Sequence, residues 1–400
     1  MGREAVLGIG TPDYLRRAEA ANARHVEIPH VNIYHLSQSS ERDAFANALR
    51  ETPQKTGVLP WKADSPDGII LDALDRGVFV DTFAAYQLPD LATSKRSKDY
   101  FKSHPDLMQR YGSLFNRGQY SNVVEFPWKS NQGRFVRILN KEPFYEINYS
   151  RNRHLISKEA QEALRKTKFI VAGMGVGTAC AYLLALTGAE NFCVIDGGVK
   201  KNHDSNRLLG SNVGEIGLNH AVSWARMALE ANPYMNIECH PQNAGEGNLT
   251  LDKLLEGDGN KVFLELTDDL AFKLGARMTT DTRMATDVGF GGVMHKDLKG
   301  IPFQGRMTPD VIATLQNPDI DFETKTQIAS QVMVGYENIP AHYLKALGQS
   351  QESGAPFWPQ IGAAAFLSAA MTVTAIMMDL EGEKTNPEVL VDLKKQLANR

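Results

Sequence analysis

The chain has 400 residues, of which 42% are hydrophobic and 22% are charged, a composition typical of a globular protein with two or three domains. Its 43 basic and 47 acidic side chains give a net charge of −4. This balance argues against a nucleic-acid partner, because proteins that coat nucleic acid carry a basic excess. The cysteines Cys180, Cys193 and Cys239 form no CxxC pair, so we expect no structural zinc and no disulfide framework. We therefore predict a cytoplasmic protein.

Residues 1–120 form the first predicted domain, and the sequence does not identify its fold. Helical patterns occur near 12–23, 40–50 and 97–113, and short apolar runs between them favour an α+β region. The first residues are charged and lack the apolar core of a secretory signal.

The second predicted domain covers residues 121–400. It opens with two strand-like runs, Val123–Phe126 and Arg134–Leu139, which the turn Asn131-Gln132-Gly133 separates. Two such runs around a glycine-containing turn predict a β-hairpin.

The clearest pattern begins at Lys168. A short apolar strand over 168–172 precedes the glycine-rich turn Gly173-Met174-Gly175-Val176-Gly177, an apolar helix over 178–186 and a second strand that ends in Asp196. Helix and strand patterns then alternate at 216–231, 236–240, 249–255 and 261–266. Such alternation forms sheets covered on both faces. The sequence therefore predicts an α/β fold with a Rossmann-like, mostly parallel sheet.

The glycine-rich turn and Asp196 indicate a nucleotide site. Gly173, Gly175 and Gly177 permit a tight turn and close approach of a ligand, and the N–H groups at the start of the next helix can bind phosphate oxygens. Asp196 lies where an acid usually bonds the ribose hydroxyls. Thr178 replaces the third glycine of the GxGxxG fingerprint, so a purely structural turn is the alternative interpretation.

Two polar segments follow strands of this sheet. Residues 199–207 read VKKNHDSNR and can place basic and small polar groups near phosphates; a solvated surface loop is the alternative. Thr267-Asp268-Asp269 follows the fourth strand, and ligands bind at the carboxyl ends of parallel strands. Mg²⁺ usually takes one or two carboxylates plus phosphate oxygens. We therefore expect Asp268 to hold Mg²⁺ and Asp269 to cap the following helix.

Together these residues resemble the ThiF/MoeB/ubiquitin-activating superfamily of ATP-dependent adenylating enzymes, over about residues 145–300 and less sharply over 355–380. The family's "SNLNRQ"-like segment corresponds to residues 204–208, in which Arg207 matches its phosphate-binding arginine. The family's glycine loop and ribose acid match those named above. The resemblance implies that ATP is bound by Gly173, Gly175, Gly177, Asp196, Asp204, Asn206, Arg207, His220 and Lys273.

The resemblance also implies which residues carry the reaction. Asp268 matches the aspartate of the family's "TDN" magnesium motif, and Arg207 would stabilise charge on the phosphates. Arg151, in the segment Tyr149–Arg153, matches the arginine of a "RYSRQ" segment that reaches the ATP of the neighbouring subunit; Arg153 is the nearby alternative. A homodimer in which Arg151, Arg207 and Asp268 are catalytic follows from this match.

Three departures from the family pattern are visible. His220 replaces a phosphate-binding lysine, and it keeps a hydrogen-bond donor but loses the fixed charge. Zinc-binding CxxC pairs are absent. No cysteine follows Cys239 to serve as a thioester carrier, while Cys180 and Cys193 fall in a predicted core helix and strand. The expected enzyme therefore works without a cysteine thioester.

The resemblance implies that a carboxylate of a peptide or small protein attacks the α-phosphate of ATP and pyrophosphate leaves. An amine or another substrate group would then capture the acyl-adenylate, as in enzymes that tailor ribosomal peptides, with residues 1–120 as the binder of a peptide or partner. A catalytically weakened nucleotide-binding partner subunit is one alternative, which His220 favours. An NAD-binding oxidoreductase is the other, and the segments 199–207 and 267–269 disfavour it.

One uncharged segment and one group of histidine and cysteine residues bear on membrane and metal binding. Residues 361–378 carry no charge and reach the minimum length of a membrane span, but their small residues favour a buried helix, so we expect no membrane partner. His240, His295 and Cys239 are too scattered in the sequence to indicate a metal site and are interpreted as structural.

Overall fold

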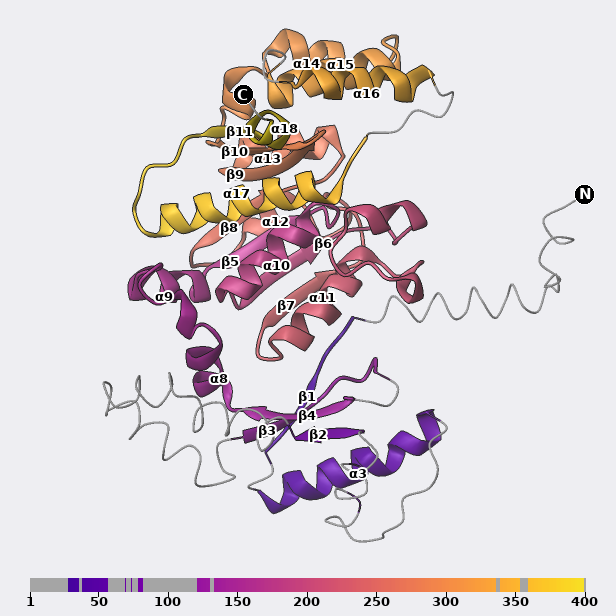
Figure 1. The fold of residues 1–400 in the computed structure, drawn as a ribbon, viewed down its shortest axis with the longest axis vertical. Coiled ribbons are helices and arrows are strands. Elements are labelled where there is room, and N and C mark those ends of the chain that lie inside the picture. Colours follow the sequence, from indigo (N-terminus) through magenta and orange to yellow (C-terminus); the bar gives the residue numbers. More distant parts are fainter. Residues whose placement is uncertain are drawn as a thin grey trace, which may run out of the picture. The chain divides into compact units, whose positions relative to one another are not determined.

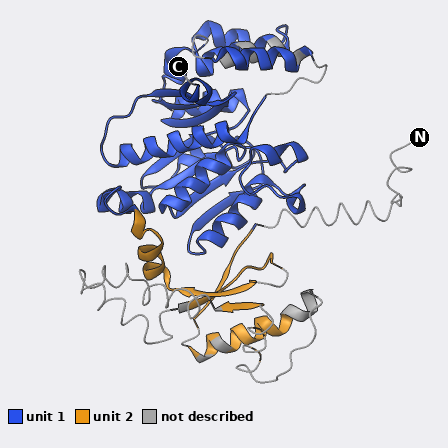
Figure 2. Ribbon diagram, viewed as in Figure 1, with its two compact units in different colours: residues 1–28, 152–400 blue, residues 29–151 orange. Residues whose placement is uncertain are grey.

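The structure is a computed structural model that describes residues 28–35, 38–56, 69, 73, 78–81, 121–129, 133–335, 339–352 and 359–398. The described residues fall into two compact units, one within Pro29–Arg151 and the other within Met1–Ile28 and Asn152–Arg400 (Figure 2). The sequence places the domain boundary at residue 120, whereas the units divide after Arg151. The difference arises because strands after residue 120 pair with strands that precede it.

The smaller unit contains a four-stranded sheet of order β1-β3-β4-β2. Its strands are β1 (Asn32–Tyr34), β2 (Phe79–Asp81), β3 (Ser121–Glu125) and β4 (Phe135–Leu139). The predicted hairpin is confirmed, since β3 and β4 pair antiparallel with Val124 opposite Val136. The smaller unit also contains the helices α3 (Ser39–Thr56) and α8 (Lys141–Asn148).

Helix α3 contributes Phe45 and Leu49 to a core shared with Phe79 and Phe135 of the small sheet. The helical pattern over 40–50 lies inside this helix. The patterns over 12–23 and 97–113 lie outside the described residues.

The larger unit is built on a seven-stranded sheet of order β11-β10-β9-β8-β5-β6-β7 (Figure 1). Strands β5 to β9 are parallel, and β10 and β11 add antiparallel pairs at one side. The mostly parallel, Rossmann-like sheet is thus confirmed. The strands are β5 (Lys168–Ala172), β6 (Asn191–Ile195), β7 (Asn236–His240), β8 (Lys261–Glu265), β9 (Thr282–Val288), β10 (Gly291–Asp297) and β11 (Glu388–Asp392).

Helices cover both faces of this sheet, because successive strand residues point to opposite sides. On one face Phe169 and Phe192 stack toward Trp224 of helix α11. On the other face Ile170 and Phe263 belong to one cluster with residues of α12 and α13. The helices of this region are α9 (Lys158–Lys166), α10 (Gly177–Thr187), α11 (His220–Ala231), α12 (Leu251–Leu255), α13 (Leu270–Thr279) and α17 (Gly362–Leu380).

Helix α17 contains nearly all of the uncharged segment noted in the sequence and ends with Asp379 and Leu380. It packs across β9 and β10 (Figure 1), and its inner face buries small residues such as Ala365, Ser368 and Ala369. By length and composition this one helix, among the described residues, could cross a membrane, and half of its apolar window is buried in the protein. Small residues let the helix approach the sheet closely: a Cβ on Gly292 of β10 would lie 2.7 Å from the Ser368 nitrogen.

The remaining elements follow β10 and end the described chain. Met284 of β9 packs with Phe303, Met307 and Val332 in a separate core cluster. These elements are the 3₁₀ helix η7 (Pro302–Gly305), the helices α14 (Pro309–Gln316), α15 (Phe322–Val334) and α16 (Ala341–Glu352), and the terminal helix α18 (Leu393–Leu397).

Candidate nucleotide site

The glycine loop joins β5 to α10 at the carboxyl edge of the parallel strands, and its three glycines differ in what they face. Gly173 has a φ of +92°, and a Cβ there would lie 2.4 Å from the Leu266 carbonyl oxygen. A Cβ on Gly177 would lie 3.1 Å from Val171 Cγ1, so this glycine serves helix packing. Around Gly175 nothing lies within 4 Å of an added Cβ. Gly175 therefore leaves open space where a phosphate can approach the backbone.

The two glycines Gly173 and Gly175 give a matched prediction. We expect Gly173→Ala to lower the free energy of unfolding by more than about 2 kcal/mol, because the left-handed conformation alone costs a Cβ-bearing residue about 1–2 kcal/mol and the overlap with Leu266 adds to it. Gly175→Ala should change stability by less than about 0.5 kcal/mol but weaken ATP binding. Denaturant titration and calorimetry measure the two effects; equal stability losses in both variants would contradict this assignment.

Asp196 follows β6 and ties the glycine loop to the next segment. Its Oδ2 accepts a 2.6 Å hydrogen bond from the Met174 backbone N–H, and its Oδ1 accepts one of 2.6 Å from the Gly198 N–H. Oδ2 keeps a second lone pair, so the carboxylate can still accept a hydroxyl group of a ribose. The Asn219 side chain donates to the Asp196 carbonyl at 2.7 Å and fixes the backbone there.

Asp204 organises the polar segment predicted to lie near the phosphates. It is buried in the 3₁₀ helix η5 (Asn202–Asn206), and its carboxylate accepts from the Lys201 backbone N–H at 2.8 Å and from Arg207 Nη2 at 3.0 Å. Asn206 donates from its side chain to the Gln360 carbonyl at 2.9 Å. The predicted residues Asp204, Asn206 and Arg207 thus lie together, with Asp204 as the group that orients Arg207.

The two lysines before this helix differ from each other. The Lys200 ammonium is buried and forms an ion pair with Glu215 at 2.5 Å. This ion pair occupies the ammonium group, so Lys200 is not available to a phosphate. The Lys201 side chain is exposed. Only Lys201 of this pair is therefore placed to meet a ligand.

His220 begins helix α11 and lies between two carboxylates. Its Nδ1 is 3.5 Å from Asp196 Oδ1, and its Nε2 is 3.3 Å from Asp204 Oδ2. A neutral imidazole carries one N–H, so it can donate to only one of these oxygens, whereas the imidazolium donates to both. Burial disfavours the charged ring, but the hydrogen bonds and charges of Asp196 and Asp204 outweigh it and raise the pKa of His220 above 6.5.

This arrangement predicts a pH-dependent nucleotide affinity. We expect ATP to bind more weakly as the pH rises through the raised pKa of His220, because the imidazolium beside Asp196 and Asp204 loses its charge. His220→Lys should flatten that dependence by restoring a fixed cation. Calorimetric titrations from pH 6 to 9 would show it; an equally steep decline in His220→Lys would refute the role of the histidine.

The same group also links folding to pH. Because the folded-state pKa of His220 is raised, its contribution to stability is complete below the unfolded value of 6.5 and is lost as the pH rises through the folded value. The pKa values of Asp196 and Asp204 are lowered: burial opposes this, but hydrogen bonds, including those with His220, prevail. Their contribution is present above 3.8 and is lost as the pH falls through the folded values.

The Thr267–Asp269 motif follows β8 beside the glycine loop. Asp269 Oδ1 accepts from the Phe272 N–H at 2.9 Å and caps helix α13, as expected. Asp268 is exposed and makes no hydrogen bond within the described part of the chain. An exposed, uncommitted carboxylate at this edge fits Mg²⁺ that is shared with phosphate oxygens.

Glu265, the last residue of β8, holds the start of this motif by hydrogen bonds. The sequence pattern did not indicate this role. It is fully buried, and its Oε1 accepts from the Thr267 N–H at 3.0 Å and from the Thr267 hydroxyl at 2.7 Å. Its Oε2 pairs with Lys273 at 2.8 Å and with Arg277 at 2.6 Å. Glu265 was hidden because it reads as one more residue of an otherwise apolar strand.

Lys273 is therefore placed differently from the other predicted cofactor residues. Its ammonium is buried and bound to Glu265, so contact with a phosphate would need the side chain to leave that ion pair. Burial lowers the pKa of Lys273, and the charge of Glu265 offsets this only in part. Its assignment to the nucleotide stays a prediction, whereas its contact with Glu265 is structural.

Arg151 and Arg153 are both exposed. Arg151 lies in the 3₁₀ helix η4 (Ser150–Asn152) and belongs to the smaller unit, while the glycine loop belongs to the larger one. Donation of Arg151 to the site of a neighbouring subunit stays a prediction.

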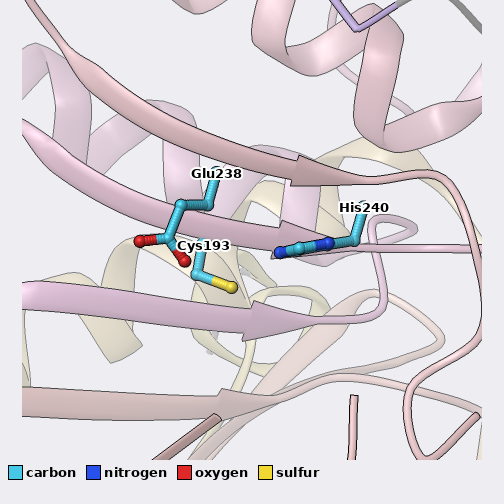
Figure 3. Close-up of side chains that lie close together, drawn as sticks. All are labelled: Cys193, Glu238 and His240. Atoms are coloured by element: carbon cyan, nitrogen blue, oxygen red, sulfur yellow. The ribbon is translucent and has the colours of Figure 1, made fainter. Parts of the chain in front are cut away.

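Among the described residues, a cluster of possible metal ligands lies on the adjacent strands β6 and β7. Cys193 of β6 and Glu238 and His240 of β7 have ligand atoms within 4.8 Å of one another (Figure 3). His240, interpreted above as structural, thus lies near Glu238 of its own strand and near Cys193, which the sequence did not indicate because Cys193 comes from the adjacent strand. Lys168 already donates to both Glu238 oxygens, at 2.7 and 2.9 Å. Its positive charge opposes a cation at this position.

Part of the chain matches a known protein family, and part of it is similar to a curated relative. Residues 149–274 match the model of the ThiF family, a range that contains the glycine loop, Asp196, the 199–207 segment and Thr267–Asp269. The resemblance seen in the sequence is confirmed for this segment. The chain is also 31% identical over 239 residues to Uncharacterized protein MT1398 of Mycobacterium tuberculosis (strain CDC 1551 / Oshkosh), covering 57% of this chain. It spans only 29% of that relative.

Several solved structures are similar to this chain. E. coli MccB with ATP is 15% identical with a TM-score of 0.39, over 57% of this chain and 60% of that one. E. coli MccB with selenomethionine MccA is 15% identical with a TM-score of 0.42, over 75% and 77%. PaaA is 17% identical with a TM-score of 0.44, over 74% and 92%. At TM-scores below 0.5 these likenesses add nothing to the assignment of the site.

Proposed function

We propose that this chain is an ATP-dependent adenylating enzyme that activates the carboxylate of a peptide or small protein. The observation that carries the proposal is the convergence of four features on one sheet edge. These are the open backbone at Gly175, the carboxylate of Asp196, the Asp204–Arg207–His220 group and the uncommitted Asp268, all within the ThiF-matching segment. This edge is where an α/β sheet binds ligands.

The chain's residues have distinct parts in the proposed reaction. The glycine loop and Asp196 hold the phosphates and the ribose of ATP, so that the substrate carboxylate can attack the α-phosphorus in line as pyrophosphate departs. Arg207, oriented by Asp204, and the imidazolium of His220 stabilise negative charge on the phosphates. Asp268 would hold Mg²⁺, which would neutralise further phosphate charge.

Capture of the adenylate without a thioester is part of the proposal. Cys180, Cys193 and Cys239 are the cysteines of this chain, and all three are buried. Burial raises the pKa of each to about 12. Since the thiolate is the nucleophile, these cysteines are poor carriers, and an amine that attacks the adenylate directly suits the chain better.

The proposal extends to a homodimer and to the smaller unit. In a homodimer Arg151 would complete the neighbouring subunit's ATP site, as the resemblance implies. The sheet of the smaller unit would bind the peptide substrate or a partner. A cytoplasmic location completes the proposal, and neither a membrane nor a nucleic acid takes part in it.

Nucleotide binding is the experiment that tests this function. Calorimetry should show binding of ATP with Mg²⁺ and no comparable binding of NAD. Wild-type protein should then exchange radiolabelled pyrophosphate into ATP when a carboxylate substrate is present. Preference for NAD would favour the oxidoreductase, and ATP binding with no exchange across a broad peptide pool would favour a weakened partner subunit.

A further inference from the structure

The carboxyl edge carries one more acidic side chain, Asp287 near the end of β9. Strands β8 and β9 are parallel, with Leu264 opposite Arg283. Asp268 follows the end of β8, and Asp287 is the residue before the last one of β9, so both lie toward the carboxyl edge of these strands. In the sheet β9 lies on the other side of β8 from β5 and β6, so Asp287 lies on the side of the edge away from Asp196.

Asp287 is buried, with 1% of its surface exposed. Its Oδ1 accepts a 2.9 Å hydrogen bond from Gln360 Nε2, while its Oδ2 has no partner in the part of the chain that the structure describes. The carbonyl of the same Gln360 accepts from Asn206, next to Arg207. Gln360 therefore connects Asp287 directly to the segment that is proposed to hold the phosphates.

The other carboxylates at this edge are already engaged. Asp196 and Asp204 each accept several hydrogen bonds from the chain, and Asp269 caps helix α13. Asp268 is the proposed holder of Mg²⁺. A buried acceptor without a donor is costly, so the free Oδ2 of Asp287 points to a ligand that brings an N–H or O–H group.

We propose that Asp287 forms the acceptor subsite of this enzyme, where its free Oδ2 binds the attacking amine and takes its proton. This inference rests on the proposed adenylation. In the step, the amine nitrogen forms a bond to the acyl carbon and the bond from that carbon to the phosphate oxygen breaks. AMP leaves with the electron pair, and the proton of the amine passes to Asp287. No other reactant is needed.

The surroundings of Asp287 suit a base. Burial raises its pKa, and the hydrogen bond from Gln360, a hydrogen bond from its own backbone and the charge of Arg207 lower it less. A carboxylate is a better base when its pKa approaches neutral pH. Tyr343 of α16 also interacts with the charge of Asp287, and burial, together with that charge, raises the pKa of Tyr343 well above its usual 10. Tyr343 therefore stays neutral and does not compete for the proton.

The test separates the two half-reactions in wild type and in Asp287→Asn. A pool of octapeptides with free carboxyl termini supplies the carboxylate, pyrophosphate exchange reports adenylate formation, and AMP release reports transfer. Glycinamide and hydroxylamine serve as acceptors, because hydroxylamine attacks an acyl-adenylate without a base. We expect Asp287→Asn to keep the exchange and the hydroxylamine reaction, while AMP release to glycinamide falls about 10²–10⁴-fold, the usual contribution of a general base.

Controls make the outcome decisive. Asp310→Asn, at an exposed aspartate of α14, should behave as wild type. Asp287→Asn should be at least as stable as wild type, since it removes a buried carboxylate whose pKa is raised, and a thermal melt checks this. Unchanged transfer to glycinamide, or equal losses of exchange and transfer, would overturn the subsite. Absence of exchange in wild type itself would instead refute the adenylation on which the subsite depends.

Discussion

Replacing Asp268 by asparagine is expected to weaken the binding of ATP with Mg²⁺ and to lower pyrophosphate exchange about 10²–10³-fold, the loss typical of one removed charge-stabilising group. The reason is that Asp268 is exposed and uncommitted, so its charge is free to hold the cation. Asparagine keeps the shape and removes the charge. Binding of ATP without Mg²⁺ should change little, which calorimetry in the presence of a chelator measures.

The neighbouring carboxylate provides the matched control. Asp269→Asn should keep both ATP binding and exchange, because asparagine caps a helix about as well as aspartate and Asp269 already bonds the Phe272 N–H. If Asp269→Asn abolished exchange and Asp268→Asn did not, the two roles would have to be reversed. If neither variant mattered, the magnesium assignment at this motif would be wrong.

The largest expected loss of stability comes from Glu265. Glu265→Gln should lower the free energy of unfolding by about 3–5 kcal/mol, because removing one partner leaves buried charge without compensation. Lys273 would lose its carboxylate, and Asp297, at 2.8 Å, would remain as the carboxylate paired with Arg277. Urea denaturation measures the change.

A second ion pair of the same sheet calibrates this result. Glu238→Gln breaks the exposed pair with Lys168 and should cost no more than about 1 kcal/mol. Similar costs in the two variants would mean that the Glu265 group does not stabilise the fold as a buried network. Glu265→Gln should also weaken exchange, because Thr267 would lose the acceptor that fixes the start of the Asp268 motif.

The pH dependence of this network has a definite sign. Burial opposes ionisation of Glu265, but the charges of Lys273 and Arg277 outweigh it and lower its pKa. The stability that it contributes is therefore present above the unfolded value of 4.5 and is lost as the pH falls through the folded value. Wild type should lose stability in acid more steeply than Glu265→Gln does.

Much of the larger unit could be predicted because its signals are local. The strand over 168–172 and the strand over 236–240 coincide with β5 and β7, since short apolar or alternating runs fix a strand from neighbouring residues alone. The start of helix α11 was placed at 216, whereas the helix begins at His220, because Asn219 caps it with its side chain. The cap is one polar residue, and the apolar periodicity does not reveal it.

The smaller unit shows the opposite case. Its sheet joins β1 with β3 and β2 with β4, so residues near 32 pair with residues near 125. No local pattern contains such a pairing. The boundary at residue 120 marks a change in the sequence pattern, while the contacts place the division after Arg151.

By itself the sequence determined the order of strands and helices around the glycine loop and the identity of Asp196, Arg207 and Asp268 as polar residues after strands. These features depend on periodicity and on spacing along the chain. Only the tertiary structure showed that Lys273 forms an ion pair with Glu265 and that His220 lies between two carboxylates. It also showed that the Gln360 side chain donates a hydrogen bond to Asp287. The reason is physical: burial and charge pairing set the state of an ionisable group, and both depend on neighbours distant in the sequence.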